Sequence, residues 1–260
     1  MTNSVNLNVI GTINSPYKQK FAIPRQPGIV TAAQGQLRLT GSANNAELVR
    51  GLEQFSHIWL LFIFHGTQAQ GWKPLVRPPR LGGNKKLGVF ATRSTFRPNP
   101  IGMSVVKLDQ IELCSTRQGF TEPGSTGQHG TGQKSSQVIL HISELDLLDG
   151  TPIVDIKPYI PYADIIESAH GGYAQEQPSS NIKVIFSSAA LLALANCNQH
   201  YPTLQSLIEQ VLSQDPRPAY KQQSIDDKIY GMSLYNFNIN WQMLDNATFN
   251  VIAIDDNVNQ

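Results

Sequence analysis

Cysteine, charged residues and long apolar runs are all scarce in this sequence of 260 residues. Its two cysteines are too few for a disulfide framework or a thiolate cage, so we expect no bound metal. No apolar run approaches the roughly 18 residues of a membrane span, and the first residues, MTNSVNLNVIG, lack the pattern of a signal peptide. We therefore expect a cytoplasmic protein without a membrane partner. Charged residues make up 15% and hydrophobic residues 40%, which favours a folded globular chain over a disordered one.

Several cofactor and catalytic motifs are also missing. The only dense glycines, at 124–132, lie in a polar segment with no apolar strand before them, which excludes the glycine-rich turn of a dinucleotide-binding or common methyltransferase Rossmann domain. The chain has no GxxxxGK[ST] loop for nucleotide phosphates, no HExxH metal motif and no GxSxG nucleophile motif. Any cofactor must therefore bind by another arrangement.

Positive charge is concentrated in the first part of the chain. Residues 1–110 carry 13 Lys and Arg against three acidic residues, whereas residues 111–260 carry 7 against 16. Between Gln54 and Leu108 eight residues are basic and none is acidic. Such a run favours a polyanionic partner over an ordinary solvated surface.

The first 160 residues consist mostly of short apolar segments separated by Gly, Pro and Asn, which is typical of a barrel or a sandwich. One helix is expected at 46–55, where apolar residues recur at helical spacing. The segment 115–136 is rich in Gly, Ser, Thr and Gln and predicts a surface hairpin loop. The expected strands are residues 8–13, 36–39, 57–64, 87–92, 101–113, 137–142 and 153–156.

After Tyr162 the pattern changes, and a polar link at 171–181 precedes a second unit. We expect a strand at 182–186, helices at 187–197 and 203–213, and two strands at 230–243 and 248–254. The sequence therefore predicts a mainly β domain at 1–165 and a small α+β domain at 182–257.

Proline-pinned segments are the main candidates for a binding site. In VFATRSTFRPNPIGM (89–103), Pro98 and Pro100 stiffen a loop that carries Arg93 and Arg97, whose planar donor groups suit carboxylate or phosphate. For Arg97, bracing of loop carbonyls is an equally good interpretation. The segment KFAIPRQPG (20–28) holds Arg25 in the same style.

Two further segments carry polar side chains beside prolines. LDLLDGTPIVDIKPYIPY (145–162) presents three aspartates, each of which either binds a ligand or caps a turn. QDPRPAY (214–220) forms a turn that we expect to project Arg217 into solvent, with Tyr220 available for base stacking or core packing.

Taken together, these segments resemble the TrmO family of tRNA adenine methyltransferases, also called the TsaA or YaeB family. The resemblance covers nearly the whole chain, and its ordered motifs are specific. The longer insert at 115–136 departs from the usual form. The segments that carry the resemblance are Ile10–Gly28, Arg50–His65, Gly88–Ser104, Leu145–Tyr159 and Gln214–Tyr220.

The resemblance implies a β-barrel methyltransferase that uses S-adenosylmethionine, forms a homodimer and carries a smaller C-terminal domain. Its implied substrate is threonylcarbamoyladenosine beside the anticodon of threonine tRNA, methylated on the exocyclic nitrogen. No catalytic residue follows from it, and Tyr159 and Asp149 are candidates for a proton acceptor. The implied cofactor-binding residues are Arg25, Gln26, Pro27, His65, Gly66, Arg93, Met103, Leu145 and Asp146.

For tRNA we expect the basic surface to bind phosphates and single-stranded bases to stack on aromatic rings. Two alternatives stay open at this point: a non-catalytic RNA-binding module, and a methyltransferase of the same fold that acts on a small metabolite. The tRNA-binding candidates are Lys85, Lys86, Arg97, Arg217 and Tyr220.

Overall fold

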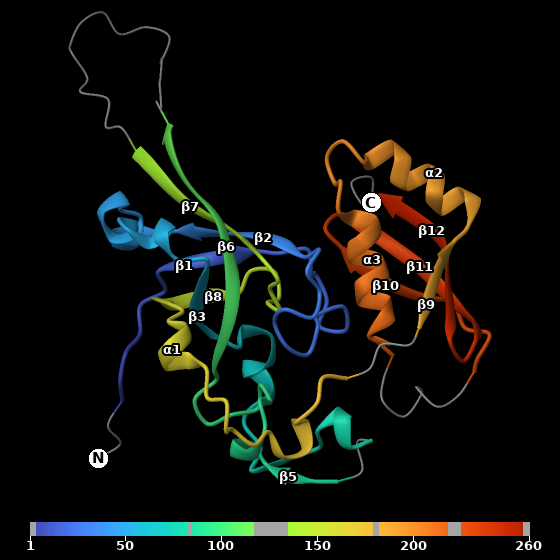
Figure 1. Cartoon of the computed structure of the whole chain (residues 1–260), viewed down its shortest axis with the longest axis horizontal. Coiled ribbons are helices and arrows are strands. Elements are labelled where there is room, and N and C mark those ends of the chain that lie inside the picture. The colour runs from blue at the N-terminus through green and yellow to red at the C-terminus, as the bar shows by residue number, and fades with distance from the viewer. Residues whose placement is uncertain (1–3, 83–84, 117–134, 179–181, 218–224, 257–260) are drawn as a thin grey trace, which may run out of the picture.

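The computed structural model describes residues 4–82, 85–116, 135–178, 182–217 and 225–256. These residues form a closed antiparallel barrel and a smaller unit with a four-stranded sheet and two helices (Figure 1). The expected mainly β fold with a small α+β unit is thereby confirmed. The expected loop at 115–136 falls for the most part outside the described residues, but the strands beside it pair with each other as far as Thr116 and Ser135.

Six strands close the barrel, and each pairs with its neighbours in antiparallel fashion. The ring closes where β8 returns to β1, with Gly11 opposite Ile153. In pairing order the strands are β1 (Gly11–Asn14), β2 (Gln34–Leu39), β7 (Ser135–Ser143), β6 (Ile101–Thr116), β3 (His57–Ile63) and β8 (Pro152–Pro158).

Alternation of side chains explains how these strands form the barrel core. In β3, with the sequence HIWLLFI, every second residue is buried. Because successive side chains of a strand point to opposite faces, Ile58, Leu60 and Phe62 all reach the interior. They pack there with Val106 of β6 and Leu140 of β7.

Two local expectations for the barrel unit are wrong. The helix expected at 46–55 is instead a pair of 3-10 turns, Ala46–Val49 and Leu52–Gln54, because Gly51 between them has a φ of 84° and interrupts any helix. The strand expected at 87–92 shrinks to β5 (Leu87–Gly88), which pairs with β4 (Leu75–Val76). Other 3-10 turns lie at Gly41–Ala43, His65–Gln70, Pro79–Leu81, Val89–Ala91 and Gly172–Ala174, and helix α1 spans Pro161–Asp164.

The C-terminal unit covers one sheet with two helices. Five apolar residues of α3 at helical spacing are buried, whereas α2 buries only Ala190 and Leu194. The single strand expected at 230–243 is wrong, because a turn at Tyr235, with a φ of 52°, divides it into a hairpin. In sheet order the elements are β10 (Tyr230–Leu234), β11 (Phe237–Asp245), β12 (Thr248–Asp256) and β9 (Lys183–Phe186), with α2 (Ser188–Cys197) and α3 (Leu204–Ser213).

Contacts from the segment after β1 join the two units. Tyr17 is fully buried and forms an isolated β-bridge with Leu234 of β10. The side-chain oxygen of Gln210 in α3 accepts a hydrogen bond of 2.9 Å from the amide of Ala32. Apolar packing is continuous across both units. The proline-pinned segment 20–28 is therefore held between the barrel and the C-terminal unit.

Candidate cofactor site

A cavity of about 320 Å³, called here the cofactor cavity, opens where β3 ends and β6 begins. Its wall draws on four segments far apart in the sequence: the turn after Lys20, the end of β3, the loop before β6 and the turn after β7. Seven of the nine implied cofactor residues line it, namely Arg25, Gln26, His65, Gly66, Arg93, Met103 and Asp146. The other two, Pro27 and Leu145, are not part of the lining.

Close packing of β6 against β3 fixes one side of this cavity. Gly102 of β6 lies opposite Phe62, and a Cβ at Gly102 would come within 2.4 Å of the Phe62 ring. The amide of Phe64 donates a hydrogen bond of 2.8 Å to the carbonyl of Pro100. Because glycine lets the strands approach, the next residue, Met103, is placed at the cavity with 55% of its surface exposed.

A buried carboxyl group lies on the cavity wall. The hydroxyl of Ser104 donates a hydrogen bond of 2.6 Å to Oδ1 of Asp146. Burial raises the pKa of Asp146 to about 6, although this bond, the residue's own amide and the charge of Arg93 act in the opposite direction. At neutral pH Asp146 is therefore an anion without full compensation of its charge, and it suits a cationic ligand group.

A guanidinium group lines the same cavity as this carboxylate. Arg93 donates a hydrogen bond to the side-chain oxygen of Gln26 and so links the loop before β6 to the segment 20–28. Arg93 and Asp146 thus present opposite charges to one cavity. A ligand with a carboxylate and an ammonium group fits such a pair.

A buried polar atom of the cavity lacks a hydrogen-bond partner in the part of the chain that the structure describes. Oγ1 of Thr67 is buried and has no hydrogen-bond partner among the residues that the structure describes. An unpaired buried hydroxyl costs about 1–3 kcal/mol, so a polar ligand atom here would remove a penalty. Neither Thr67 nor Ser104 is among the cofactor residues predicted from the sequence. For Ser104 a signal was present, since this small polar residue alternates with the apolar residues Val106 and Leu108 at the inward positions of β6.

The two candidate proton acceptors lie outside the cofactor cavity. Asp149 accepts a hydrogen bond of 2.9 Å from the amide of Ser15, and its second oxygen is 2.7 Å from the ammonium of Lys18. Its observed role is therefore to hold a turn. Tyr159 follows β8 and packs its ring against Trp59, near the start of β3, whereas the cavity is at the end of β3.

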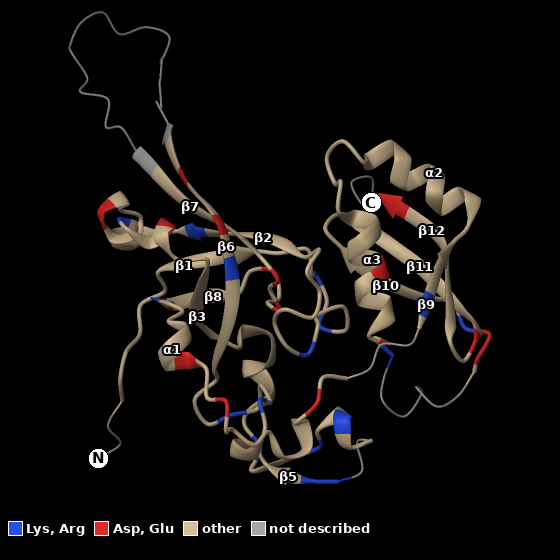
Figure 2. Cartoon of the chain, viewed as in Figure 1, with Lys and Arg blue, Asp and Glu red and all other residues tan. Residues whose placement is uncertain are grey.

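The basic residues proposed for RNA differ in their surroundings. Lys85 and Lys86 are exposed and directly precede β5, where Figure 2 shows positive charge. Arg97 instead braces its own loop, because its guanidinium donates a hydrogen bond of 2.7 Å to the carbonyl of Thr92. Of the two interpretations left open for Arg97, bracing is the one observed, and its contact with tRNA stays a prediction.

The expectation that Arg217 projects into solvent is wrong. Only 4% of its surface is exposed, and its guanidinium forms an ion pair of 2.7 Å with Asp215 and lies 5.3 Å from the ring centre of Phe249. The proline pattern predicted an exposed side chain, whereas the guanidinium of Arg217 is buried between its own turn and the sheet of the C-terminal unit. Tyr220 lies outside the described residues.

The described part of the chain contains neither a helix of the length and apolarity that a membrane span requires nor three His, Cys, Asp or Glu side chains grouped to hold a metal ion.

The chain is similar to known methyltransferases over nearly its whole length. Residues 12–165 match the tRNA-methyltransferase O N-terminal domain, and residues 179–257 match the TrmO C-terminal domain. The chain is 47% identical over 252 residues to tRNA (adenine(37)-N6)-methyltransferase of Escherichia coli strain K12, covering 97% of this chain and 98% of that protein. It is 44% identical over 245 residues, 93% of each chain, to a putative S-adenosylmethionine-dependent methyltransferase, RcsF, of Pseudomonas aeruginosa. A crystal structure of TrmO from Pseudomonas aeruginosa superimposes with a TM-score of 0.74 at 35% identity, covering 98% of this chain and all of that one.

Proposed function

Because the chain belongs to the tRNA-methyltransferase O family, we propose that it transfers a methyl group from S-adenosylmethionine to the exocyclic nitrogen of an adenine in tRNA. One observation carries this proposal: four segments distant in sequence converge on one cavity, and that cavity contains most of the residues that the family resemblance implies for the cofactor. A non-catalytic RNA-binding module has no need of such a cavity.

The residues of the cavity fit the parts of S-adenosylmethionine. The amino-acid end of this cofactor carries a carboxylate and an ammonium group, which we assign to Arg93 and Asp146 respectively. The unpaired hydroxyl of Thr67 is available to a polar atom of the ribose or the adenine. The apolar side chains of Phe64 and Leu148 supply contact surface for the rest of the molecule.

The chemistry asks for positioning more than for a reactive side chain. When bound, the cofactor supplies an activated methyl group, which leaves the sulfonium sulfur as the acceptor nitrogen forms its new bond to carbon. The protein must align donor and acceptor and exclude water from between them, which accounts for much of the acceleration in such reactions. The nitrogen also loses a proton. Because neither Tyr159 nor Asp149 lines the cavity, we propose that this proton passes to water.

We further propose threonylcarbamoyladenosine at position 37 of threonine tRNA as the substrate. A carbonyl group attached to the exocyclic nitrogen makes its proton more acidic than that of plain adenine, which reduces the need for a general base.

Binding of tRNA phosphates is assigned to the basic surface that includes Lys85 and Lys86, with Arg97, Arg217 and Tyr220 as further candidate contacts. The homodimer that the resemblance implies and the cytoplasmic location expected from the missing signal peptide belong to the same proposal, and light scattering of the purified protein tests the homodimer.

Nucleoside mass spectrometry tests the substrate directly. The protein is incubated with methyl-labelled S-adenosylmethionine and either threonylcarbamoylated tRNA or the same tRNA lacking that modification. We expect label on the threonylcarbamoyladenosine of the first tRNA only. Label on both tRNAs would contradict the proposed substrate, and no label on either would contradict tRNA methylation. A small-metabolite methyltransferase would also be insensitive to salt, whereas transfer to tRNA should weaken as salt rises.

A further inference from the structure

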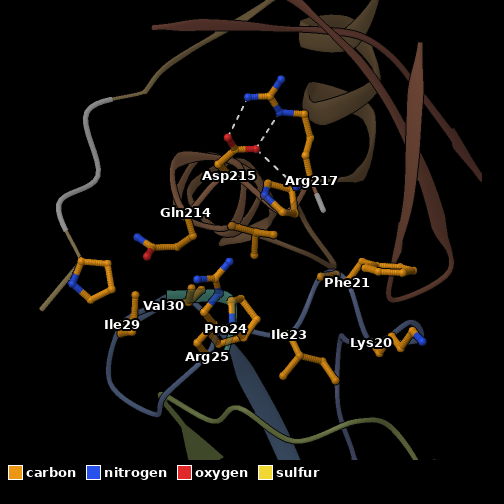
Figure 3. Close-up of a pocket in the computed structure, with 15 residues that line it drawn as sticks. Lys20, Phe21, Ile23, Pro24, Arg25, Ile29, Val30, Gln214, Asp215 and Arg217 are labelled. Atoms are coloured by element: carbon orange, nitrogen blue, oxygen red, sulfur yellow. Dashed lines mark hydrogen bonds and ion pairs between the residues drawn. The ribbon is translucent and has the colours of Figure 1, made fainter. Parts of the chain in front are cut away.

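A second cavity, of about 340 Å³, lies between the barrel and the C-terminal unit and is called here the interdomain cavity (Figure 3). One wall consists of residues from the segment 20–30, and the facing wall includes the end of α3 and residues 214–217. Lys20, Ile23, Pro24 and Arg25 line both this cavity and the cofactor cavity. A single stretch of chain therefore separates the two spaces.

The interdomain cavity offers an apolar surface with an aromatic ring at its side. Phe21 lines this cavity but not the cofactor cavity, and 58% of its surface is exposed. The ammonium of Lys20 lies 5.1 Å from the centre of that ring. Four prolines, Pro24, Pro79, Pro178 and Pro216, add rigid apolar contacts. An exposed ring beside a cation is the combination that stacks a base of single-stranded nucleic acid.

The charge of this cavity also suits RNA. Among the described residues of its lining the single carboxylate is Asp215, which Arg217 holds through bonds of 2.8 Å to Oδ1 and 2.7 Å to Oδ2. Figure 3 shows this pair on one side of the cavity and Arg25 on the other. Burial lowers the pKa of Arg25. The negative charge of Asp215 opposes this effect, and the positive charge of Arg80 adds to it. A further anion beside Arg25 would offset the burial of its charge.

We propose that the interdomain cavity holds the base of a nucleotide adjacent to the target adenine in a single-stranded RNA loop, and that Arg25 binds the phosphate between the two nucleotides. This inference rests on the proposed function. With the target adenine at the cofactor cavity, the RNA backbone crosses the stretch 20–25, and the neighbouring base enters on the other side beside Phe21. Extrusion of both bases requires an unpaired loop, which an anticodon loop provides.

Two substitutions test the interdomain cavity, and neither changes a residue that lines the cofactor cavity. Phe21→Ala removes the stacking ring, and Gln214→Glu adds a negative charge without a change of shape, on a residue that lines the interdomain cavity alone. The matched controls are Tyr162→Ala, an aromatic residue that is 90% exposed, and Gln199→Glu on the exposed surface of the C-terminal unit. We expect each test variant to raise the KM for tRNA roughly tenfold with unchanged kcat and cofactor affinity. An unchanged KM in both variants would overturn the inference.

Fluorescence separates this inference from the proposed function. An anticodon stem-loop RNA carries 2-aminopurine at either neighbour of the target adenine, and its emission is recorded on addition of wild-type protein or Phe21→Ala. We expect quenching at one of the two positions with wild type and a loss of that quenching in the variant. Equal signals would overturn the inference even when methylation occurs. If the quenching is present but no methyl group is transferred, the result supports base binding in the interdomain cavity and contradicts the proposed function. Competition by free AMP as effective as that by the RNA would show a mononucleotide site instead.

Discussion

The hydroxyl of Ser104 and the carboxyl group of Asp146 are joined by a hydrogen bond of 2.6 Å that ties β6 to the turn after β7. Ser104 is only 2% exposed, so this bond lies in the protein interior at the wall of the cofactor cavity. A carboxylate in such a position lowers the stability of the fold, because its charge is taken out of water. We attribute its presence to the ligand rather than to the fold.

Asp146→Asn should therefore make the protein more stable and less able to bind its cofactor. Burial raises the pKa of Asp146 from 3.8 to about 6. The folded state thus holds this proton more tightly than the unfolded state, and stability is lost as the pH rises from about 4 through 6. At pH 8 we expect a gain of about 1 kcal/mol in the free energy of unfolding by urea, with little difference at pH 4. A less stable variant at pH 8 would contradict this assignment.

The affinity for S-adenosylmethionine should depend on pH in the same range. Binding of the cofactor's ammonium group requires Asp146 as the anion, so affinity should be constant above pH 7 and fall up to about tenfold for each pH unit below 6. Calorimetric titration between pH 5 and 8 measures the profile. Asp146→Asn serves as the control, since its weaker binding should vary little with pH. A profile that falls equally in both proteins would assign the titration to another group.

Thr67→Val should separate binding from stability in a second way. Valine has nearly the shape of threonine but lacks the buried hydroxyl that has no partner among the described residues. We expect an unchanged or higher melting temperature without ligand, because an unpaired polar group is removed. The rise in melting temperature caused by S-adenosylmethionine should shrink, with an affinity roughly fivefold lower. A ligand-induced shift equal to that of wild type would show that Thr67 does not contact the cofactor.

Gly102→Ala should damage the junction of β3 and β6. The added methyl group would come within 2.4 Å of the ring of Phe62, which is itself buried. Overpacking of this kind costs about 1–3 kcal/mol in the free energy of unfolding, and the displacement would also disturb Met103 beside it. Gly88→Ala is the matched control, because a Cβ there meets nothing within 4 Å. Chemical denaturation of both variants checks the difference, and equal stability would contradict the packing described.

Much of the fold follows from local patterns in the sequence. Alternation along β3 and the helical spacing in α3 each place their apolar residues without reference to the rest of the chain. The wrong prediction of a helix at 46–55 has a local cause too, since the spacing of apolar residues does not reveal that Gly51 adopts a positive φ. The break within 230–243 is harder to see, because Tyr235 adopts a positive φ that its residue type disfavours.

The candidate cofactor residues were predicted through family resemblance, and the chemistry proposed for them depends on contacts across the fold. The proline-pinned segments indicated rigidity but not which of them meet. Pairing of Ser104 with Asp146 requires the register of β6 beside the turn after β7, which no local pattern contains. Burial of Arg217 depends on Phe249, far along the chain, so its exposure was mispredicted from the turn alone.

Titration of S-adenosylmethionine into wild type and Arg93→Ala tests the central claim, namely that the cofactor cavity binds the methyl donor. The control is Arg77→Ala, an exposed arginine that lines neither cavity. We expect wild type and Arg77→Ala to bind with equal affinity, and Arg93→Ala to bind at least tenfold more weakly because a charged hydrogen bond to the carboxylate is lost. Equal affinity in all three proteins, with the variant folded, would show that the donor binds elsewhere.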